Sequence, residues 1–145
     1  MNTPLKKNDP AQAREFFEKK MSFTTGPVEL NGQIESHADL VIVDVRARED
    51  FEDGHIPGAI SLPREKWNAP EGLSKEKPNV LYCYSPVCHL GAAAAVQLAA
   101  MGYPVIEMDG GFQAWEENDL EVEPGEMEQS YEPGDEQENV QAVSA

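Results

Sequence analysis

The sequence has few cysteines and no long apolar run. Two of the 145 residues are Cys, which is too few for a disulfide scaffold and suits a compartment where thiols stay reduced. No segment approaches the roughly 20 apolar residues of a membrane-spanning helix. Residues 1–14 are polar and lack the apolar region of a secretory signal. These absences together predict a cytoplasmic protein without a membrane anchor.

Positive charge is also scarce. Eleven Lys and Arg residues stand against 27 Asp and Glu residues, so the formal net charge is −16. The last 30 residues contribute −11 of this charge, and residues 1–115 contribute −5. Phosphate backbones and anionic lipid surfaces repel such a chain. We therefore expect neither a nucleic-acid partner nor a membrane partner.

Composition divides the chain into four segments. Residues 1–10 contain two prolines and predict a flexible lead, and residues 11–24 predict a helix (11–21) and a first strand region. Residues 25–122 hold the apolar runs and form the expected folded domain. Residues 123–145 are rich in Glu, Gln, Pro, Gly and Ser, which predicts an acidic disordered tail.

Within the expected domain, short apolar runs alternate with helix-forming stretches. The runs predict strands at 40–45, 59–62, 79–83 and 104–108, and the stretches predict helices at 27–34, 46–53, 91–100 and 111–115. Continuous apolar runs are typical of strands buried on both faces, as in parallel sheets. Strands that alternate with helices predict an α/β fold with a parallel sheet.

Cys83 lies where the run 79–83 ends, just before a turn and a helix. Ligand sites of open α/β sheets occupy the carboxyl ends of the strands. Unpaired N–H groups of the turn and of the following helix would favour an anion there. Cysteine pKa values at such sites fall to roughly 3.5–7.5, which makes the thiolate a nucleophile. The alternative is an inert, buried cysteine, since Cys often packs as a small hydrophobe.

Three further segments accompany Cys83 in a recognisable order. They are residues 43–46 (VDVR), 54–59 (GHIPGA) and 109–115 (DGGFQAW). With Cys83 at the position of the catalytic cysteine, residues 25–122 resemble a single-domain rhodanese, a member of a sulfurtransferase family. The resemblance implies a three-layer rhodanese-like α/β domain, with a mostly parallel five-stranded sheet flanked by helices.

The resemblance also implies a reaction. Cys83 takes a sulfane sulfur from thiosulfate or a persulfide, becomes a persulfide, and passes the sulfur to a thiol acceptor, small or protein, or to cyanide. No metal, nucleotide or organic cofactor is implied, and we expect a monomer. A cradle of backbone N–H groups would hold the anionic sulfur, contributed by Tyr84, Ser85, Val87, Cys88 and His89.

The loop after Cys83 departs from the commonest rhodanese pattern. Many members carry Gly at the third position after the cysteine and a basic residue at the fifth, where this chain has Pro86 and Cys88. Proline has no N–H group, so one donor is missing from the cradle. Without a loop cation, we expect weak binding of a dianion such as thiosulfate, which favours a persulfide donor.

Cys88 and His89 leave other interpretations open. Cys88 could resolve an oxidised or persulfidated Cys83 through a disulfide, and the chain could then be a non-catalytic rhodanese-like module that binds a partner or senses oxidants. Cys83, Cys88 and His89 could also ligate a metal, although three ligands are few. Phosphatases of related fold need Arg six positions after the cysteine. This chain has His89 there, so the sequence argues against a phosphatase.

The remaining candidates have supporting roles. We expect Asp44 to bond loop backbone, Arg46 to pair with Asp44 or Glu49, and His55 to fix the geometry of its turn. Trp67 is a candidate for the pocket rim. Two aromatic residues at helical spacing, Phe112 and Trp115, are expected in the core.

Overall fold

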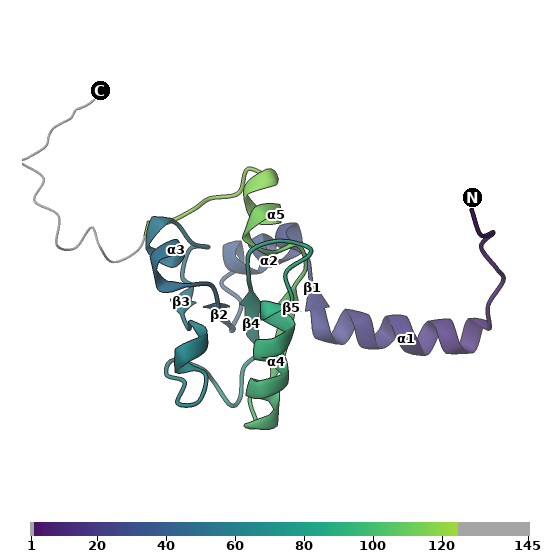
Figure 1. Ribbon diagram of the computed structural model, residues 1–145, viewed down its shortest axis with the longest axis horizontal. Coiled ribbons are helices and arrows are strands. Elements are labelled where there is room, and N and C mark those ends of the chain that lie inside the picture. Colours follow the sequence, from purple (N-terminus) through teal and green to yellow (C-terminus); the bar gives the residue numbers. More distant parts are fainter. Residues whose placement is uncertain (1, 125–145) are drawn as a thin grey trace, which may run out of the picture.

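The computed structural model describes residues 2–124. Figure 1 shows a twisted sheet flanked by helices, with one helix projecting from it. The strands are β1 (Thr24–Thr25), β2 (Val41–Asp44), β3 (Ile60–Ser61), β4 (Asn79–Tyr82) and β5 (Val105–Met108). The helices are α1 (Pro10–Phe23), α2 (Pro27–Glu35), α3 (Arg48–Asp53), α4 (Leu90–Ala100) and α5 (Gly111–Glu117), with a short 3-10 helix, η1 (Arg64–Lys66).

All five strands are parallel and lie in the order β1-β5-β4-β2-β3. The predicted fold class, a three-layer α/β domain with a five-stranded sheet, is confirmed. The two-residue β1 forms the fifth strand, beside β5. Because every strand runs the same way, the carboxyl ends of β2, β4 and β5 meet at one edge of the sheet.

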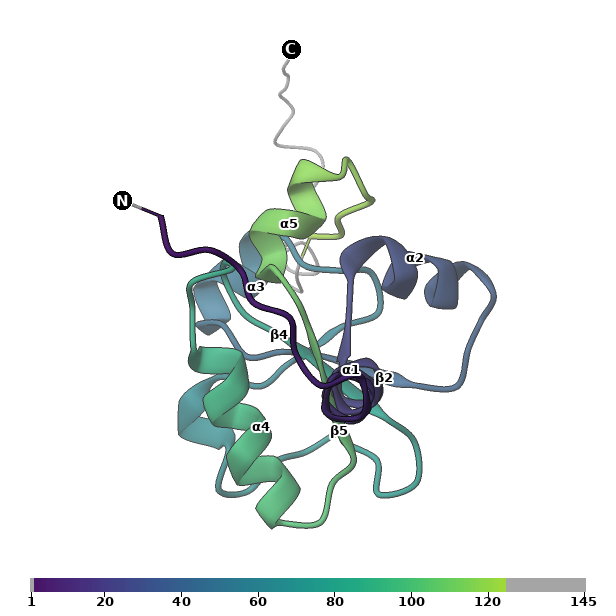
Figure 2. The ribbon, with the colours of Figure 1, turned by 90° about the vertical axis from the view of Figure 1, so that its right-hand side faces the viewer.

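Side-chain alternation along the central strands separates two cores. Val80 and Tyr82 of β4 pack on one face with Trp115 and Phe112 of α5, as predicted for these aromatic residues. Leu81 packs on the opposite face, together with side chains of α4. Figure 2 shows α4 on one side of the sheet and α2 and α5 on the other. The sheet is thus the middle layer of three.

Helix α1 lies apart from both cores. Its aspartate cap at Asp9 accepts a hydrogen bond from the Ala11 N–H, and Pro10 occupies the first turn, where its missing N–H costs nothing. None of its residues is buried. Figure 1 shows it extending away from the sheet. No helix within residues 2–124 has the length and apolarity to span a membrane.

The end of the described chain returns to the domain. Glu123 forms an antiparallel bridge with His55, through backbone hydrogen bonds of 2.8 and 2.9 Å. The packed structure therefore includes Glu123, which the sequence assigns to the tail. The rest of the predicted tail, from residue 125 on, lies outside the described residues, and the other segment boundaries stay predictions.

Candidate active site

Cys83 directly follows β4 and is only 3% exposed. It contributes to the wall of a cavity of about 140 Å³ at the carboxyl edge of the sheet. The remaining lining comes from the loop after β4, the start of α4 and the end of β5: Ser85, Pro86, Cys88, His89, Ala92, Glu107, Met108, Asp109, Gly110 and Gly111. The residue expected to be the catalytic cysteine therefore lies in the wall of a cavity.

The loop residues predicted for the N–H cradle do not all face this cavity. The Cys88 N–H donates to the Ser85 carbonyl at 3.1 Å, so it is occupied within the loop turn, contrary to the prediction. Val87 is 86% exposed and is not among the lining residues. The Ser85 N–H does interact with the Cys83 sulfur, and so does the N–H of Gly91, which the sequence analysis did not consider. The cradle remains a proposal, with a changed set of donors.

A second thiol lies beside the first. The Cys83 Sγ–H donates to the Cys88 carbonyl at 3.6 Å, and the two thiols interact with each other. Both are free cysteines. The Cys88 sulfur accepts the Leu90 N–H at 3.4 Å and also interacts with the Tyr84 N–H. One N–H group at the start of α4 and one in the loop after β4 thus act on Cys88 rather than on Cys83.

The two thiols differ in acidity. Burial raises the pKa of Cys83, and its contact with the Cys88 thiol raises it further, while the N–H groups of Gly91 and Ser85 act in the opposite direction. Burial also acts to raise the pKa of Cys88, but the N–H groups of Leu90 and Tyr84 and the contact with the Cys83 thiol lower it, and the net pKa is lowered. The position of Cys83 in the sequence instead predicts a lowered pKa for this thiol. Burial in the folded domain reverses that direction, because the loss of solvent disfavours the thiolate.

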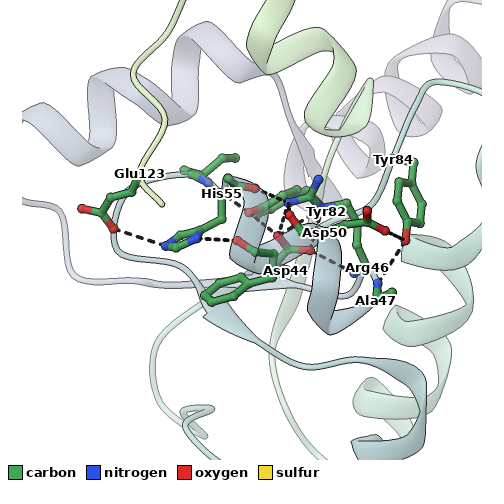
Figure 3. Close-up of polar contacts among 11 residues, drawn as sticks. Asp44, Arg46, Ala47, Asp50, His55, Tyr82, Tyr84 and Glu123 are labelled. Atoms are coloured by element: carbon green, nitrogen blue, oxygen red, sulfur yellow. Dashed lines mark hydrogen bonds and ion pairs between the residues drawn. The ribbon is translucent and has the colours of Figure 1, made fainter. Parts of the chain in front are cut away.

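Asp44 and Arg46 form a buried ion pair (Figure 3). The Arg46 Nη2 lies 2.7 Å from the Asp44 Oδ2 and also donates to the Gly54 carbonyl at 2.6 Å. The Arg46 N–H donates to the Asp44 Oδ1 at 2.9 Å. Arg46 therefore pairs with Asp44, one of the two predicted partners, and joins the end of β2 to the end of α3. Neither residue lines the cavity.

The tyrosines on either side of Cys83 hydrogen-bond to this pair and to the start of α3 (Figure 3). Tyr82 donates its hydroxyl to Asp44 at 2.7 Å and accepts the Ile56 N–H at 3.1 Å. Tyr84 donates a short hydrogen bond to Asp50 and accepts the Ala47 N–H. Because both neighbours are held, the backbone at Cys83 is fixed from both sides.

His55 and Trp67 also lie outside the cavity. The His55 Nδ1 is 2.9 Å from the Phe51 carbonyl, and its ring stacks on Phe51 with centroids 3.8 Å apart. This arrangement agrees with a structural role for His55 in its turn. Trp67 is 3% exposed, packs in the core on the α4 side and donates to the Leu62 carbonyl. Its predicted place at the pocket rim is wrong, because the indole N–H finds its partner inside the domain.

Glu107, a lining residue on β5, is not among the site residues predicted from the sequence. Burial raises the pKa of this carboxyl, as does the charge of Asp109, while His89 lowers it. The signal was present in the sequence, since Glu107 is a charged residue within an otherwise apolar strand run. Among residues 2–124, no cluster of three or more His, Cys, Asp or Glu side chains is placed to hold a metal ion.

The chain is thus a three-layer α/β domain with a parallel sheet, in which a buried cysteine lies between a central strand and the following helix. The sequence profile of the rhodanese-like domain matches residues 26–118. This chain belongs to the rhodanese-like domain family.

Individual relatives agree with this assignment. The chain is 35% identical over 95 residues to "Probable adenylyltransferase/sulfurtransferase MoeZ" of Mycobacterium tuberculosis, covering 63% of this chain but only 24% of MoeZ. It is 35% identical over 79 residues to "Thiosulfate sulfurtransferase GlpE" of Coxiella burnetii, covering 53% of this chain and 72% of that protein. The crystal structure of BH2092 from Bacillus halodurans matches with a TM-score of 0.76 and 32% identity, covering 86% of this chain and all of the other.

Proposed function

We propose that this protein is a sulfurtransferase whose sulfur carrier is Cys83. The observation that carries the proposal is the cavity at the carboxyl edge of the sheet, where Cys83 lies beside a second thiol and two N–H donors. The family assignment and the sulfurtransferase names of two relatives support the same reaction class.

The reaction has two balanced steps. The Cys83 thiolate attacks the outer sulfur of a donor, and the electron pair of the broken S–S bond leaves with sulfite, from thiosulfate, or with a thiolate, from a persulfide. Cys83 then carries a persulfide. An acceptor thiolate or cyanide attacks the outer sulfur and releases the Cys83 thiolate again.

Two backbone N–H groups of the site have a role in this reaction. The N–H groups of Ser85 and Gly91 already interact with the Cys83 sulfur and would stabilise the thiolate and the persulfide anion. A cavity of about 140 Å³ suits a donor of a few heavy atoms. The acceptor is accordingly a small thiol, or a protein thiol that reaches the mouth of the cavity.

The contact between the two thiols favours a second candidate function, in which Cys88 resolves the persulfide. The Cys88 thiolate would attack the inner sulfur of the Cys83 persulfide, form a Cys83–Cys88 disulfide and release hydrosulfide. The lowered pKa of Cys88 supports this step, because the thiolate is the attacking species. Such a protein would report on sulfane sulfur or oxidants rather than pass sulfur on.

Intact mass spectrometry after incubation with thiosulfate or an alkyl persulfide tests these proposals. We expect a gain of one sulfur atom in the wild type and none in Cys83→Ser. Transfer predicts that added thiol removes the sulfur and restores the reduced mass. Resolution predicts a disulfide in the wild type and a stable persulfide in Cys88→Ser. No adduct with either donor would refute the sulfurtransferase proposal.

A further inference from the structure

Glu107 lies on the same face of the sheet as Cys83. In the parallel register, Glu107 of β5 pairs with Leu81 of β4, two residues before Cys83. Side chains two residues apart on a strand share a face, so the Glu107 carboxyl is the diagonal neighbour of the Cys83 thiol. The cavity lining includes both residues.

Gly91 shows how near the carboxyl and the thiol come to each other. A methyl group placed on Gly91 would lie 2.8 Å from the Glu107 Oε2 and 3.5 Å from the Cys83 Sγ. The two atoms therefore border the same small gap at the start of α4. The absence of a side chain at Gly91 leaves this gap open to the carboxyl.

The two carboxylates that line the cavity differ in their basic partners. Asp109, a second lining residue, is 3.7 Å from the Lys20 ammonium of α1. Within residues 2–124, no Lys or Arg side chain forms an ion pair with Glu107. His89 is the basic residue that acts on it. Any donor that reaches Cys83 must therefore approach a carboxylate in a partly desolvated cavity, where charge interactions are stronger than in water.

We propose that Glu107 determines donor specificity by charge. Its carboxylate repels donors that carry negative charge next to the transferable sulfur, thiosulfate in particular, and leaves alkyl persulfides with a neutral or cationic group as the preferred class. This proposal rests on the proposed sulfur transfer at Cys83, and it names the class of substrate for that site.

The test compares an anionic and a neutral reagent at the same thiol. Iodoacetate and iodoacetamide alkylate cysteine by the same chemistry, and peptide mass mapping gives the rate at Cys83 separately from that at Cys88. A change in thiol acidity alters both rates equally, so their ratio isolates charge selection. We expect Glu107→Gln to raise the iodoacetate-to-iodoacetamide ratio about tenfold, as removal of one nearby charge predicts.

Two variants serve as controls. Glu107→Asp keeps the charge and should keep the ratio within about twofold of wild type. Glu71→Gln removes the same charge at an exposed residue outside the cavity and should leave the ratio unchanged. An unchanged ratio in Glu107→Gln, or an equal acceleration of both reagents, would overturn the proposal.

The ratio should also depend on pH. Protonation of Glu107 below its raised pKa removes the repulsion, so the wild-type ratio should rise as the pH falls, and it should rise less in Glu107→Gln. Asp109, His89, Cys83 and Cys88 also line the cavity, but both proteins contain them, so the comparison isolates Glu107. Equal pH profiles in the two proteins would contradict the role of Glu107.

Sulfur donors complete the test. The rate of one-sulfur gain from thiosulfate relative to cysteamine persulfide should rise about tenfold in Glu107→Gln. If alkylation shows charge selection but neither donor adds sulfur, the proposed function fails and charge selection remains. If sulfur adds in the wild type and neither ratio changes, the charge proposal fails alone.

Discussion

At the scale of single residues, two neighbouring thiols differ in acidity because their surroundings differ. Cys83 donates its S–H to a carbonyl and is buried, which favours the thiol. Cys88 accepts N–H hydrogen bonds, which favours the thiolate. The more acidic sulfur is thus that of Cys88 and not that of Cys83, the proposed sulfur carrier.

Alkylation should reveal this difference. With iodoacetamide near neutral pH, we expect Cys88 to react before Cys83, because its pKa is lowered and only the thiolate reacts. The Cys83 rate should climb as the pH rises toward its raised pKa, since the thiolate fraction grows in that direction. Peptide mass mapping over a pH series measures both. Faster labelling of Cys83 near neutral pH would contradict this assignment.

The Tyr82 hydroxyl has two buried hydrogen-bond partners. Tyr82→Phe leaves the Asp44 carboxylate and the Ile56 N–H each without one hydrogen bond. We expect a loss of about 1–3 kcal/mol in the free energy of unfolding, the usual cost of such a deletion, measured by urea denaturation. Tyr103→Phe is the matched control, because no hydrogen bond of its hydroxyl is found within residues 2–124. Equal losses in both variants would refute the role of the Tyr82 hydroxyl.

At the scale of elements, the loop after β4 is held by the start of α5. The Phe112 and Gln113 N–H groups donate to the carbonyls of Cys83 and Tyr84 at 2.7 and 2.9 Å. This close approach requires a glycine at Gly111, which has a φ of +67°. The geometry of the cysteine loop therefore depends on a neighbouring strand-to-helix turn.

Gly111→Ala tests this dependence. The added methyl would lie 2.5 Å from the Ser85 N and 2.8 Å from the Cys83 carbonyl oxygen, on a backbone conformation that alanine disfavours. We expect a loss of more than about 2 kcal/mol of stability and slower persulfide formation. Gly32→Ala, within α2 and with no atom within 4 Å, should instead gain about 0.5–1 kcal/mol. Urea denaturation and intact mass measure these effects, and an unaffected Gly111→Ala would contradict them.

Helix α1 contributes little to the domain core. It has no buried residue, and its ion pair from Lys20 to Asp109 is half exposed. Deletion of residues 1–23 should therefore shift the melting temperature by less than about 4 °C, which corresponds to about 1 kcal/mol. Differential scanning calorimetry measures the shift. A much larger loss would show that α1 is needed at the β1 edge.

At the scale of the whole molecule, the net charge of −16 acts on every anionic donor before it reaches the cavity. Salt screens such long-range repulsion, with a Debye length of roughly 30 Å at 0.01 M and 8 Å at 0.15 M. The acidic surface and Glu107 thus act in the same direction at different ranges.

Ionic strength should therefore accelerate the reaction with thiosulfate. Between roughly 10 and 150 mM salt, we expect kcat/KM for thiosulfate to rise about threefold. The value for cysteamine persulfide should fall or stay constant, because its amine is cationic. Steady-state sulfur transfer at several salt concentrations checks this prediction. Equal salt dependence for both donors would contradict it.

The sequence by itself determined the layered fold and the place of Cys83. Apolar runs such as residues 40–45 and 79–83 bury both faces of a strand, and a turn after a parallel strand falls at the carboxyl edge of the sheet. These properties are local, so periodicity and spacing predict them. Closeness in the sequence also predicted Asp44 as a partner for Arg46.

Only the tertiary structure decided the chemistry around that cysteine. Burial raises the pKa of Cys83, and the carboxyl of Glu107 reaches its cavity from β5, a segment distant in the sequence. Trp67 likewise joined the core through contacts distant in the sequence, in one buried cluster with Leu81 and Leu98. Burial and electrostatics act through space, so residue spacing along the chain could not predict them.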